Sequence, residues 1–528
     1  MTTEKAESSA SSYSIALIVC LLVVRVLTVV RSYIGRYRLR LPPGPRRIPV
    51  LGNIHQLPPV YQQHLFAEWG KQFGDLVYAR FFRTPVLILN RIHTARALLE
   101  KRGAKYSSRP SFTYQRDIVH FDHVIIMPYS DRWRRHRRWF QNALLTRNTL
   151  STYEPMQRRE VQTMLHDILH DSEGALAHIR RYTAAVMLGV GYGYSPTSLD
   201  DKYIKMTEEA IELALGGTGP SSGLVDFFPE LQYLPAWMPG MGFKRKGLRA
   251  RKMTHDMDHL PLQRLQREME EGISRPCLGT ALLEDAMNKG VLDETEEHEI
   301  AGALGVLYVG KRPLATAATL TAFVLLMALH QDIQKKMQAE IDSVVGDLRL
   351  PASTDRTSLP YFEAVLKEVY RWLAPAPLGT PHQVTESDVY EGFDIEKGAT
   401  VITNIWAMTR EEELFQDPER FDPERFLGTS AEISEARDPR RFVFGFGRRI
   451  CPGRLIADSS VFLAAVNLVA AFDIRPGKGL DPQQAVAQSS FTSGIVRHPK
   501  PFPCYVTPRS PKNADLVLHA VDASGGEA

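Results

Sequence analysis

Hydrophobic residues recur every three or four positions along most of the chain, the spacing that places them on one face of an α-helix. The longest such stretches are residues 150–300 and the more uniformly apolar residues 300–330. Shorter runs rich in Val, Leu and Ile occur at residues 77–79, 86–89 and 400–405, and these favour strands. The pattern therefore predicts a largely helical chain with a few short strands.

The first long apolar run covers residues 13–30 and is predicted to be a membrane anchor. It is slightly shorter than the roughly 20 residues that typically span a bilayer, and Arg25 interrupts it. A basic flank follows the run, and no small-residue cleavage site comes after it, so a retained anchor is favoured over a cleaved signal peptide. This flank should stay cytoplasmic, which leaves the amino terminus across the membrane. It consists of Arg31, Arg36, Arg38 and Arg40.

A proline-rich segment, residues 41–46, separates this anchor region, residues 1–40, from the body of the chain. Proline fixes the backbone and resists helix formation, so the segment is predicted to be a stiff hinge. Residues 47–510 are predicted to form one large domain, and residues 511–528 a disordered tail. The hydrophobic content of 44% and the charged content of 23% are ordinary for a globular protein.

The charge balance and the cysteines exclude several classes of protein. The formal net charge is only +4 over 528 residues, so no strongly charged partner such as nucleic acid is implied. The cysteines lack the paired spacing of a disulfide scaffold or a zinc site. They are Cys20, Cys277, Cys451 and Cys504. This usage fits a catalytic part that faces a reducing cytosol.

The most distinctive stretch, residues 444–453, reads Phe-Gly-Phe-Gly-Arg-Arg-Ile-Cys-Pro-Gly. Its glycines let the backbone turn tightly around Cys451, and Arg448 and Arg449 favour a thiolate over a thiol. The apolar residues 455–472 are predicted to form a helix that adds its positive dipole end. A buried structural cysteine is the simpler interpretation, but it would not need these neighbours. The stretch predicts a thiolate in a tight loop, facing a flat anionic group.

This stretch resembles the haem-binding loop of the cytochrome P450 family, Phe-x-x-Gly-x-Arg-x-Cys-x-Gly. Phe444, Gly447, Arg449, Cys451 and Gly453 occupy its fixed positions. The resemblance implies that Cys451 is the axial ligand of the iron of haem b, where a thiolate favours cleavage of the O–O bond. It also implies that Arg449 pairs with a haem propionate and that Phe444 packs beside the sulfur. The implied fold is the mainly helical P450 fold with a small β-rich lobe.

A strongly basic run, residues 131–139, carries a second motif of that family, Trp-x-x-x-Arg. Trp133 and Arg137 are four positions apart and would share a helix face. The resemblance implies that this pair contacts a haem propionate. The other arginines of the run form either a solvated basic face or a docking patch for an acidic electron donor. They are Arg132, Arg134, Arg135 and Arg138.

Glu368 and Arg371 form a Glu-x-x-Arg motif on a predicted helix over residues 358–373. By itself this motif is common, and a surface ion pair is the simpler interpretation. The resemblance instead joins the two residues with Arg425 in a buried charge network that holds the cysteine loop. His382, in the proline-rich turn that follows, either reaches a propionate or is a polar surface histidine.

The family also expects an acid and an alcohol at the centre of the long helix candidate, where they relay protons to bound oxygen. Here the sequence from Gly310 reads Gly-Lys-Arg-Pro-Leu-Ala-Thr, and neither group stands at its position. Only Thr316 remains, at the second hydroxyl position, and Pro313 should break or kink the helix. Three explanations are open: the reaction needs no relay, water and substrate groups replace it, or the sequence is locally wrong, for instance at an exon boundary.

The motifs are similar to those of fungal microsomal members used in secondary metabolism. They imply a monooxygenase that inserts one oxygen atom of O2 into a hydrophobic small molecule, with electrons from NADPH through a reductase and with cytochrome b5 as a further donor. The apolar turn at residues 491–495 also suggests a hydrophobic substrate. The implied location is the endoplasmic reticulum membrane, single-pass, with a cytosolic catalytic domain. Two alternatives are a haem-thiolate isomerase or dehydratase that needs no relay, and a haem protein without turnover.

Overall fold

The computed structural model describes residues 39–525, apart from residues 146, 216–219, 309–314 and 429. The predicted anchor, residues 13–30, lies outside the described residues. The predicted hinge is bonded to the body, since the backbone N–H of Tyr78 donates to the Pro43 carbonyl at 2.8 Å. The backbone N–H of Arg40 donates to the Asp394 carboxylate at 2.7 Å. The described chain therefore joins the body at the edge of its β-rich part.

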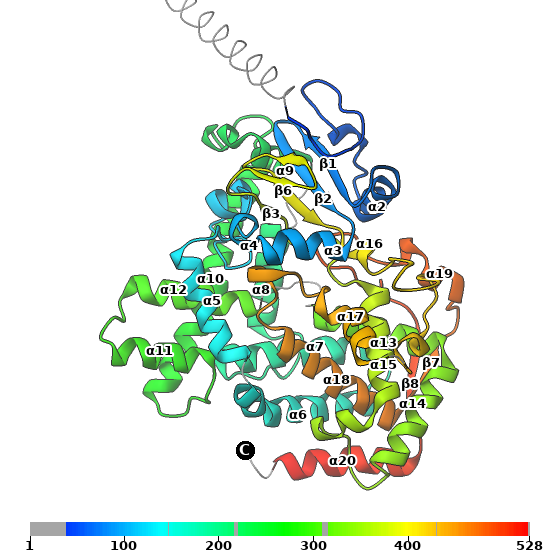
Figure 1. Ribbon diagram of the computed structural model, residues 1–528. Helices are drawn as coiled ribbons and strands as arrows, with labels where there is room; N and C mark the ends of the chain where they lie inside the picture. Colours follow the sequence, from blue (N-terminus) through cyan, green and yellow to red (C-terminus); the bar gives the residue numbers. More distant parts are fainter. Residues whose placement is uncertain (1–38, 146, 216–219, 309–314, 429, 526–528) are drawn as a thin grey trace, which may run out of the picture.

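The described chain is mainly helical, as the hydrophobic pattern predicts, and its longest helices lie in one body below the main sheet (Figure 1). In the first half of the chain the helices are α2 (Gln62–Phe73), α3 (Ile92–Ala95), α4 (Gly103–Tyr106), α5 (Asp131–Leu144), α6 (Arg147–His170), α7 (Ala175–Tyr192), α8 (Lys202–Leu215), α9 (Pro220–Phe227) and α10 (Gly242–Glu270). In the second half they are α11 (Leu278–Asn288), α12 (Glu294–Gly305), α13 (Ala315–Leu329), α14 (Gln331–Val344), α15 (Pro360–Leu373), α16 (Ile405–Met408), α17 (Ala431–Arg437), α18 (Arg454–Ala471), α19 (Pro482–Val486) and α20 (Pro511–Gly525).

The main sheet has the strand order β1-β2-β6-β3 and contains all three predicted strand regions. Strands β1 (Leu76–Phe81) and β2 (Thr84–Leu89) form an antiparallel hairpin, and β6 (Thr400–Thr403) pairs parallel to β2. The short β3 (His382–Gln383) pairs antiparallel to β6 and forms the other edge of the sheet. Two further pairs are β4 (Asp388–Tyr390) with β5 (Phe393–Ile395), and β7 (Phe472–Pro476) with β8 (Cys504–Pro508).

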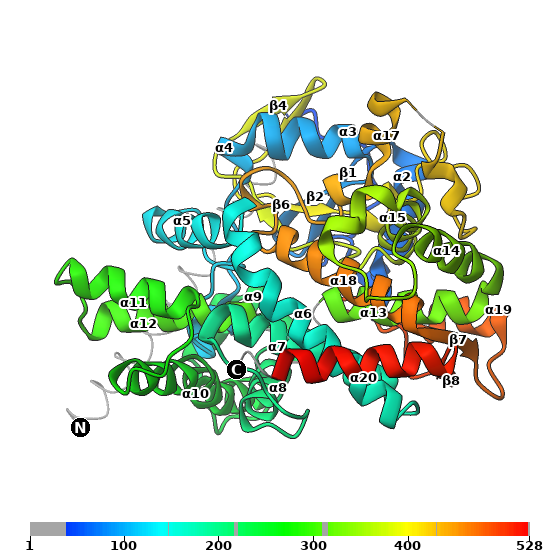
Figure 2. The ribbon, with the colours of Figure 1, turned by 90° about the horizontal axis from the view of Figure 1, so that it is seen from below.

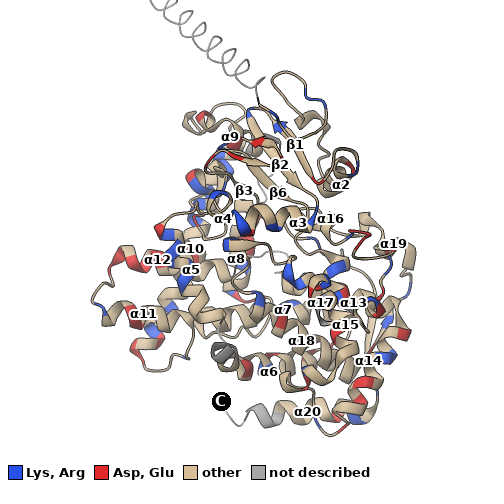
Figure 3. Cartoon of the chain, in the orientation of Figure 1, with Lys and Arg blue, Asp and Glu red and all other residues tan. Residues whose placement is uncertain are grey.

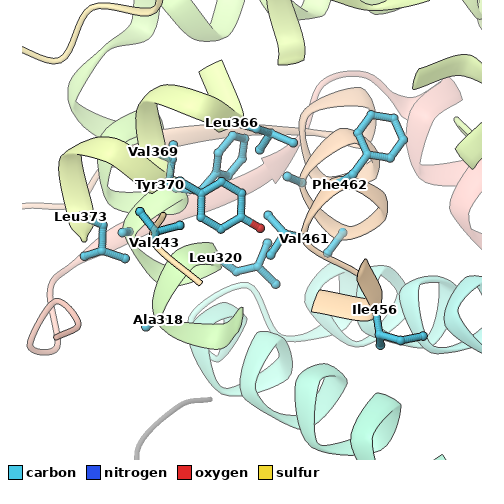
Figure 4. Packing of buried hydrophobic residues seen from close by; sticks show 14 of the residues in the cluster. Ala318, Leu320, Leu366, Val369, Tyr370, Leu373, Val443, Ile456, Val461 and Phe462 are labelled. Carbon is cyan, nitrogen blue, oxygen red and sulfur yellow. The ribbon is translucent and has the colours of Figure 1, made fainter. Parts of the chain in front are cut away.

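The core of the helical body is built from α13, α15 and α18 (Figure 4). Helix α13 is apolar on all sides and nearly all of its residues are buried, as expected for a helix without a polar face. Helix α18 is long and apolar enough to cross a membrane, but 72% of it is buried inside this body. The side chains of Leu320, Tyr370 and Val461, one from each helix, point toward one another. This packing fixes the helix that follows the cysteine loop.

The predicted helix over residues 300–330 corresponds to the end of α12 and to α13. The residues between them that carry the atypical sequence, including Gly310 and Pro313, lie outside the described residues. The predicted break at Pro313 therefore stays a prediction.

The prediction of a disordered tail at residues 511–528 is wrong for its described part, because α20 covers Pro511–Gly525 and lies along α6 (Figure 2). The Ser510 hydroxyl accepts a hydrogen bond from the backbone N–H of Asn513, which caps the start of the helix. Val517 is buried against the core. The helix is stabilised by its buried face against α6, a tertiary contact that the sequence does not show.

Candidate functional site

The cysteine loop, residues 444–453, is a tight turn that directly precedes α18, as the sequence predicts. The backbone N–H of Cys451 donates to the Phe444 carbonyl at 2.9 Å and closes the loop. Gly447 has φ +55°, and a Cβ there would lie 2.1 Å from the backbone carbonyl oxygen of Leu99. No other residue type fits that position without moving the backbone. Gly453 then caps α18, which begins one residue later.

Two opposing effects act on the pKa of the Cys451 thiol. Burial raises its pKa, whereas a hydrogen bond from the Gly453 backbone and the charges of Arg137 and Arg454 lower it. The prediction that Arg448 and Arg449 favour the thiolate is therefore wrong in its choice of residues. Arg448 reaches away to the Tyr129 hydroxyl at 2.7 Å, and Arg449 points to backbone carbonyls described next.

Arg449 is buried and holds its guanidinium in a fixed position. It donates to the carbonyls of Ser107 at 2.7 Å, Val124 at 3.2 Å and Met127 at 2.8 Å. Its guanidinium also lies 4.2 Å from the centre of the Trp133 ring, a cation–π distance. Burial, with the charge of Arg137, lowers the pKa of Arg449 to about 9.

Trp133 and Arg137 share one face of helix α5, as their spacing predicts, and both contact the cysteine loop. The helix begins where the Ser130 hydroxyl accepts a hydrogen bond from the backbone N–H of Trp133 at 3.2 Å. Both Trp133 and Arg137 are buried. Arg137 donates to the Ile450 carbonyl, next to the cysteine, at 2.6 Å. Burial lowers the pKa of Arg137, and the charge of Cys451 acts in the opposite direction.

A third buried arginine, Arg109, was not identified from the sequence. It donates to the carbonyls of Ile125 at 2.9 Å, Thr380 at 2.6 Å and Pro381 at 2.8 Å. Burial, with the nearby charge of Arg449, lowers the pKa of Arg109. No motif that the sequence analysis used contains this residue, and its role depends on three segments that are far apart in the chain.

His382 follows Pro381 and is not the polar surface histidine that one interpretation predicts. It is buried, and its Nδ1 lies 2.8 Å from the Tyr106 carbonyl, so Nδ1 carries the proton that it donates. Burial and the charge of Arg109 lower the pKa of His382 well below its usual value. The neutral ring therefore lies beside the buried arginines.

These buried cations fit an anionic group. Among the described residues, no carboxylate lies within ion-pair distance of Arg109, Arg137 or Arg449; the acceptors that the structure gives them are backbone carbonyls. Burying unpaired charges is costly. A flat ligand with carboxylates at one edge, such as haem, would supply the missing charge beside the Cys451 loop.

Glu368 and Arg371 form a fully buried pair on α15. Arg371 donates from Nε and Nη2 to the two carboxylate oxygens, each at 2.7 Å, the bidentate geometry of strong pairs. Arg425 adds a longer contact from its Nε at 3.3 Å, and the backbone N–H of Asp422 donates at 2.8 Å. The structure thus brings together the three residues that the resemblance groups.

The same helix contacts the cysteine loop directly. The ring of Tyr370 lies 5.7 Å from the ring of Phe444, centre to centre. Phe444 is partly buried rather than enclosed. The charge network and the loop are therefore connected through one helix, α15.

On the side expected to bind oxygen, Thr316 is the second residue of α13 and is partly exposed. The positions at which the family carries its acid and alcohol are Leu314 and Ala315 in an alignment without gaps. Leu314 lies outside the described residues, and Ala315 begins α13.

The other arginines of α5 are mostly paired, which argues against a free basic face (Figure 3). Arg132 donates to Glu299 of α12 at 2.8 Å, and Arg135 to Glu296 of the same helix at 2.7 Å. Arg134 pairs with Asp131 one turn earlier in α5. Much of the positive charge that the sequence analysis considered for docking is thus balanced by α12.

Comparisons with known proteins agree with the geometry. A family model described as Cytochrome P450 matches residues 42–505. The chain is 42% identical over 478 residues to cytochrome P450 monooxygenase 136 of Postia placenta, with 90% of each chain covered. It is 41% identical over 481 residues to cytochrome P450 monooxygenase 176 of the same fungus, with 91% of this chain and 92% of the relative covered. It is 36% identical over 495 residues to cytochrome P450 monooxygenase claR of Ampulloclitocybe clavipes, covering 93% of this chain and 90% of that one.

Proposed function

The chain belongs to the cytochrome P450 family, with relatives that are named monooxygenases. From this premise we propose that Cys451 holds haem b and that the enzyme inserts one atom of O2 into a hydrophobic small molecule. Thiolate-ligated haem, when bound, supplies the chemistry that splits dioxygen. One observation carries the proposal: the Cys451 loop lies beside buried arginines for which the described residues provide no carboxylate.

The chain's own residues would bind and orient the cofactor. Arg109, Arg137 and Arg449 would pair with the haem carboxylates, because each guanidinium is already fixed by backbone carbonyls. Trp133 supports the Arg449 plane from one side. The Gly453 backbone N–H donates to the Cys451 sulfur and stabilises its thiolate form.

The Glu368, Arg371 and Arg425 network would keep the cysteine loop in place. Arg371 donates further hydrogen bonds to the carbonyls of the segment between α16 and the loop, including Pro418 at 2.7 Å. The network thus holds the backbone upstream of the cysteine loop, at Thr409, Pro418 and Arg420.

The electrons would come from NADPH through a membrane-bound reductase, with cytochrome b5 as a second donor. The predicted anchor at residues 13–30 and the fungal relatives support a microsomal enzyme on the cytosolic face of the endoplasmic reticulum. A secondary metabolite is the proposed class of substrate, since the resemblance is to fungal members of such pathways.

A second candidate function is isomerisation or dehydration of an oxygenated substrate, which requires no proton relay. It is favoured by one feature of the sequence: the positions at which the family carries an acid and an alcohol hold Leu314 and Ala315, or Pro313 and Leu314 if one residue is inserted, and neither pair supplies these groups. Thr316 would then be the remaining hydroxyl near the oxygen side.

Reconstitution of the full chain with a fungal reductase separates the two functions. The probes are a panel of alkoxycoumarins and terpenes for monooxygenation, and a fatty-acid hydroperoxide for rearrangement, with products identified by mass spectrometry. Monooxygenation requires that product formation stop when NADPH, reductase or O2 is omitted. Conversion of the hydroperoxide without NADPH, together with no product from the other probes, would overturn the first function in favour of the second.

A further inference from the structure

One tight turn, residues 123–127, supplies backbone acceptors to two of the buried arginines; we refer to it as the acceptor turn. Its Val124 and Met127 carbonyls accept from the two terminal nitrogens of Arg449, at 3.2 and 2.8 Å. Its Ile125 carbonyl accepts from Nε of Arg109 at 2.9 Å. The position of this turn therefore helps to fix both guanidiniums, together with the Thr380 and Pro381 carbonyls for Arg109 and the Ser107 carbonyl for Arg449.

The acceptor turn is fixed at its first residue. The His123 carbonyl accepts from the backbone N–H groups of Ile126 and Met127, both at 3.0 Å, and so closes the turn. The His123 side chain reaches α10, where its Nε2 lies 2.9 and 3.1 Å from the two oxygens of Asp258. Only 1% of the His123 side chain and 9% of the Asp258 side chain is exposed. One residue thus closes the turn and attaches it to a long helix.

Helix α12 shapes the space for this contact. A Cβ at Gly305 would lie 1.9 Å from an Asp258 carboxylate oxygen and 3.5 Å from Nε2 of His123. Only glycine leaves room for the carboxylate to face the imidazole. At Gly302, one turn earlier, the nearest atom to a Cβ is Cδ2 of His123 at 4.0 Å, so a methyl group fits there without displacing the imidazole. The turn, α10 and α12 therefore meet at the His123–Asp258 pair.

We propose that His123 and Asp258 are positioning residues for the cofactor-binding arginines Arg109 and Arg449. The proposal rests on the proposed binding of haem. If the pair is broken, the acceptor turn can move, and its carbonyls no longer hold the two guanidiniums in the direction of the haem carboxylates. Removal of a residue that holds a ligand-binding side chain in place typically lowers the affinity for the bound group about 10–100-fold. If the pair had a purely structural role, breaking it would lower the stability of the protein without specifically weakening the binding of haem.

The test measures the rate at which haem leaves the intact enzyme for an excess of apomyoglobin, at a temperature well below unfolding. His123→Leu and Gly305→Ala are expected to speed this transfer about 10-fold. His123→Gln keeps an N–H that can donate to Asp258, so it should restore a rate near that of the wild type. If His123→Leu does not fold, Gly305→Ala decides the outcome.

Two control variants separate positioning from general stability. Gly302→Ala adds a methyl group to the same helix, 4.0 Å from the Cδ2 atom of the His123 ring, an ordinary van der Waals contact that leaves the bond to Asp258 in place. Glu160→Gln removes the negative charge from the contact with Arg181 at 3.0 Å, an equally buried pair on α6 and α7 that touches neither the turn nor its arginines. Both should release haem at the wild-type rate, and Glu160→Gln should lower the unfolding temperature.

The inference is overturned if His123→Leu and Gly305→Ala release haem no faster than Gly302→Ala, or if Glu160→Gln releases it equally fast. Its failure differs from a failure of the proposed function. Wild-type protein with the characteristic thiolate–haem carbon monoxide band, but with unchanged release in the variants, removes this inference alone. Wild-type protein without that band removes the proposed function.

Discussion

At the scale of single residues, the cysteine loop depends on glycine for a steric reason. Gly447 combines φ +55° with a neighbouring backbone oxygen that a Cβ would meet at 2.1 Å, and a backbone atom cannot move aside cheaply. The motif identified this residue from its spacing alone, and the structure supplies the cause.

Gly447→Ala is expected to destabilise the loop by about 1–3 kcal/mol, the cost of one strained backbone position, and to lower the haem content of the purified protein. Urea unfolding and haem quantification measure both effects. Gly242→Ala, at the open start of α10 where the nearest atom lies 3.8 Å away, is the control. Equal stability of the two variants would contradict the steric account.

Glu368→Ala is expected to abolish haem incorporation. It leaves Arg371 buried and unpaired, and breaking a buried pair in this way costs about 3–5 kcal/mol. The control is Glu424→Ala, which removes an exposed pair with Lys336 and should cost no more than about 1 kcal/mol. A Glu368→Ala protein with normal haem content would refute the role of the network.

At the scale of elements, α5 and α12 are joined by a cluster of charges around Glu299. Burial alone would raise the pKa of Glu299, but hydrogen bonds from His136 and Arg132 outweigh it and hold the pKa below the usual 4.5. Burial lowers the pKa of His136, only partly offset by Glu299. The folded protein therefore favours charged Glu299 and neutral His136.

The sign of the pH dependence follows from these two shifts. The stabilisation from Glu299 is present above about pH 4.5 and is lost as pH falls, because the unfolded chain then binds the proton more readily. A neutral buried His136 adds a further loss below its usual value of 6.5. Both groups make the α5–α12 contact weaker in acid.

Glu299→Gln should lower the free energy of unfolding by about 1.5–3 kcal/mol at neutral pH, the range for hydrogen bonds to charged groups. The difference from the wild type should shrink as the pH falls below the usual Glu value of 4.5. Urea unfolding across this range measures it. A difference that does not change with pH would show that the charge of Glu299 is not what stabilises the contact.

Periodicity predicted elements well where they bury a continuous apolar face and poorly elsewhere. The run after the cysteine became α18, and the two short apolar runs before residue 90 became the β1–β2 hairpin. Helix α20 was missed because its stability comes from one buried face against α6, which no local pattern reveals.

At the scale of the whole molecule, the fold class and most of the candidate site could be predicted because their residues sit at fixed spacings. The Cys451 loop and the Glu368–Arg371 pair are of this kind. Arg109 and the His123–Asp258 pair could not, since they matter only after the fold brings together segments more than a hundred residues apart. Tertiary contacts of polar groups leave little trace in a single sequence.

The most direct test of the central claim, that the Cys451 sulfur binds the haem iron, is the reduced carbon monoxide difference spectrum of the purified full chain and of its Cys451→Ser variant. The wild type should show the characteristic band of thiolate-ligated haem, and the variant should lose that band while its circular dichroism spectrum stays that of a folded helical protein. A variant that keeps the band, or a wild type whose haem is coordinated by another residue, would contradict the claim.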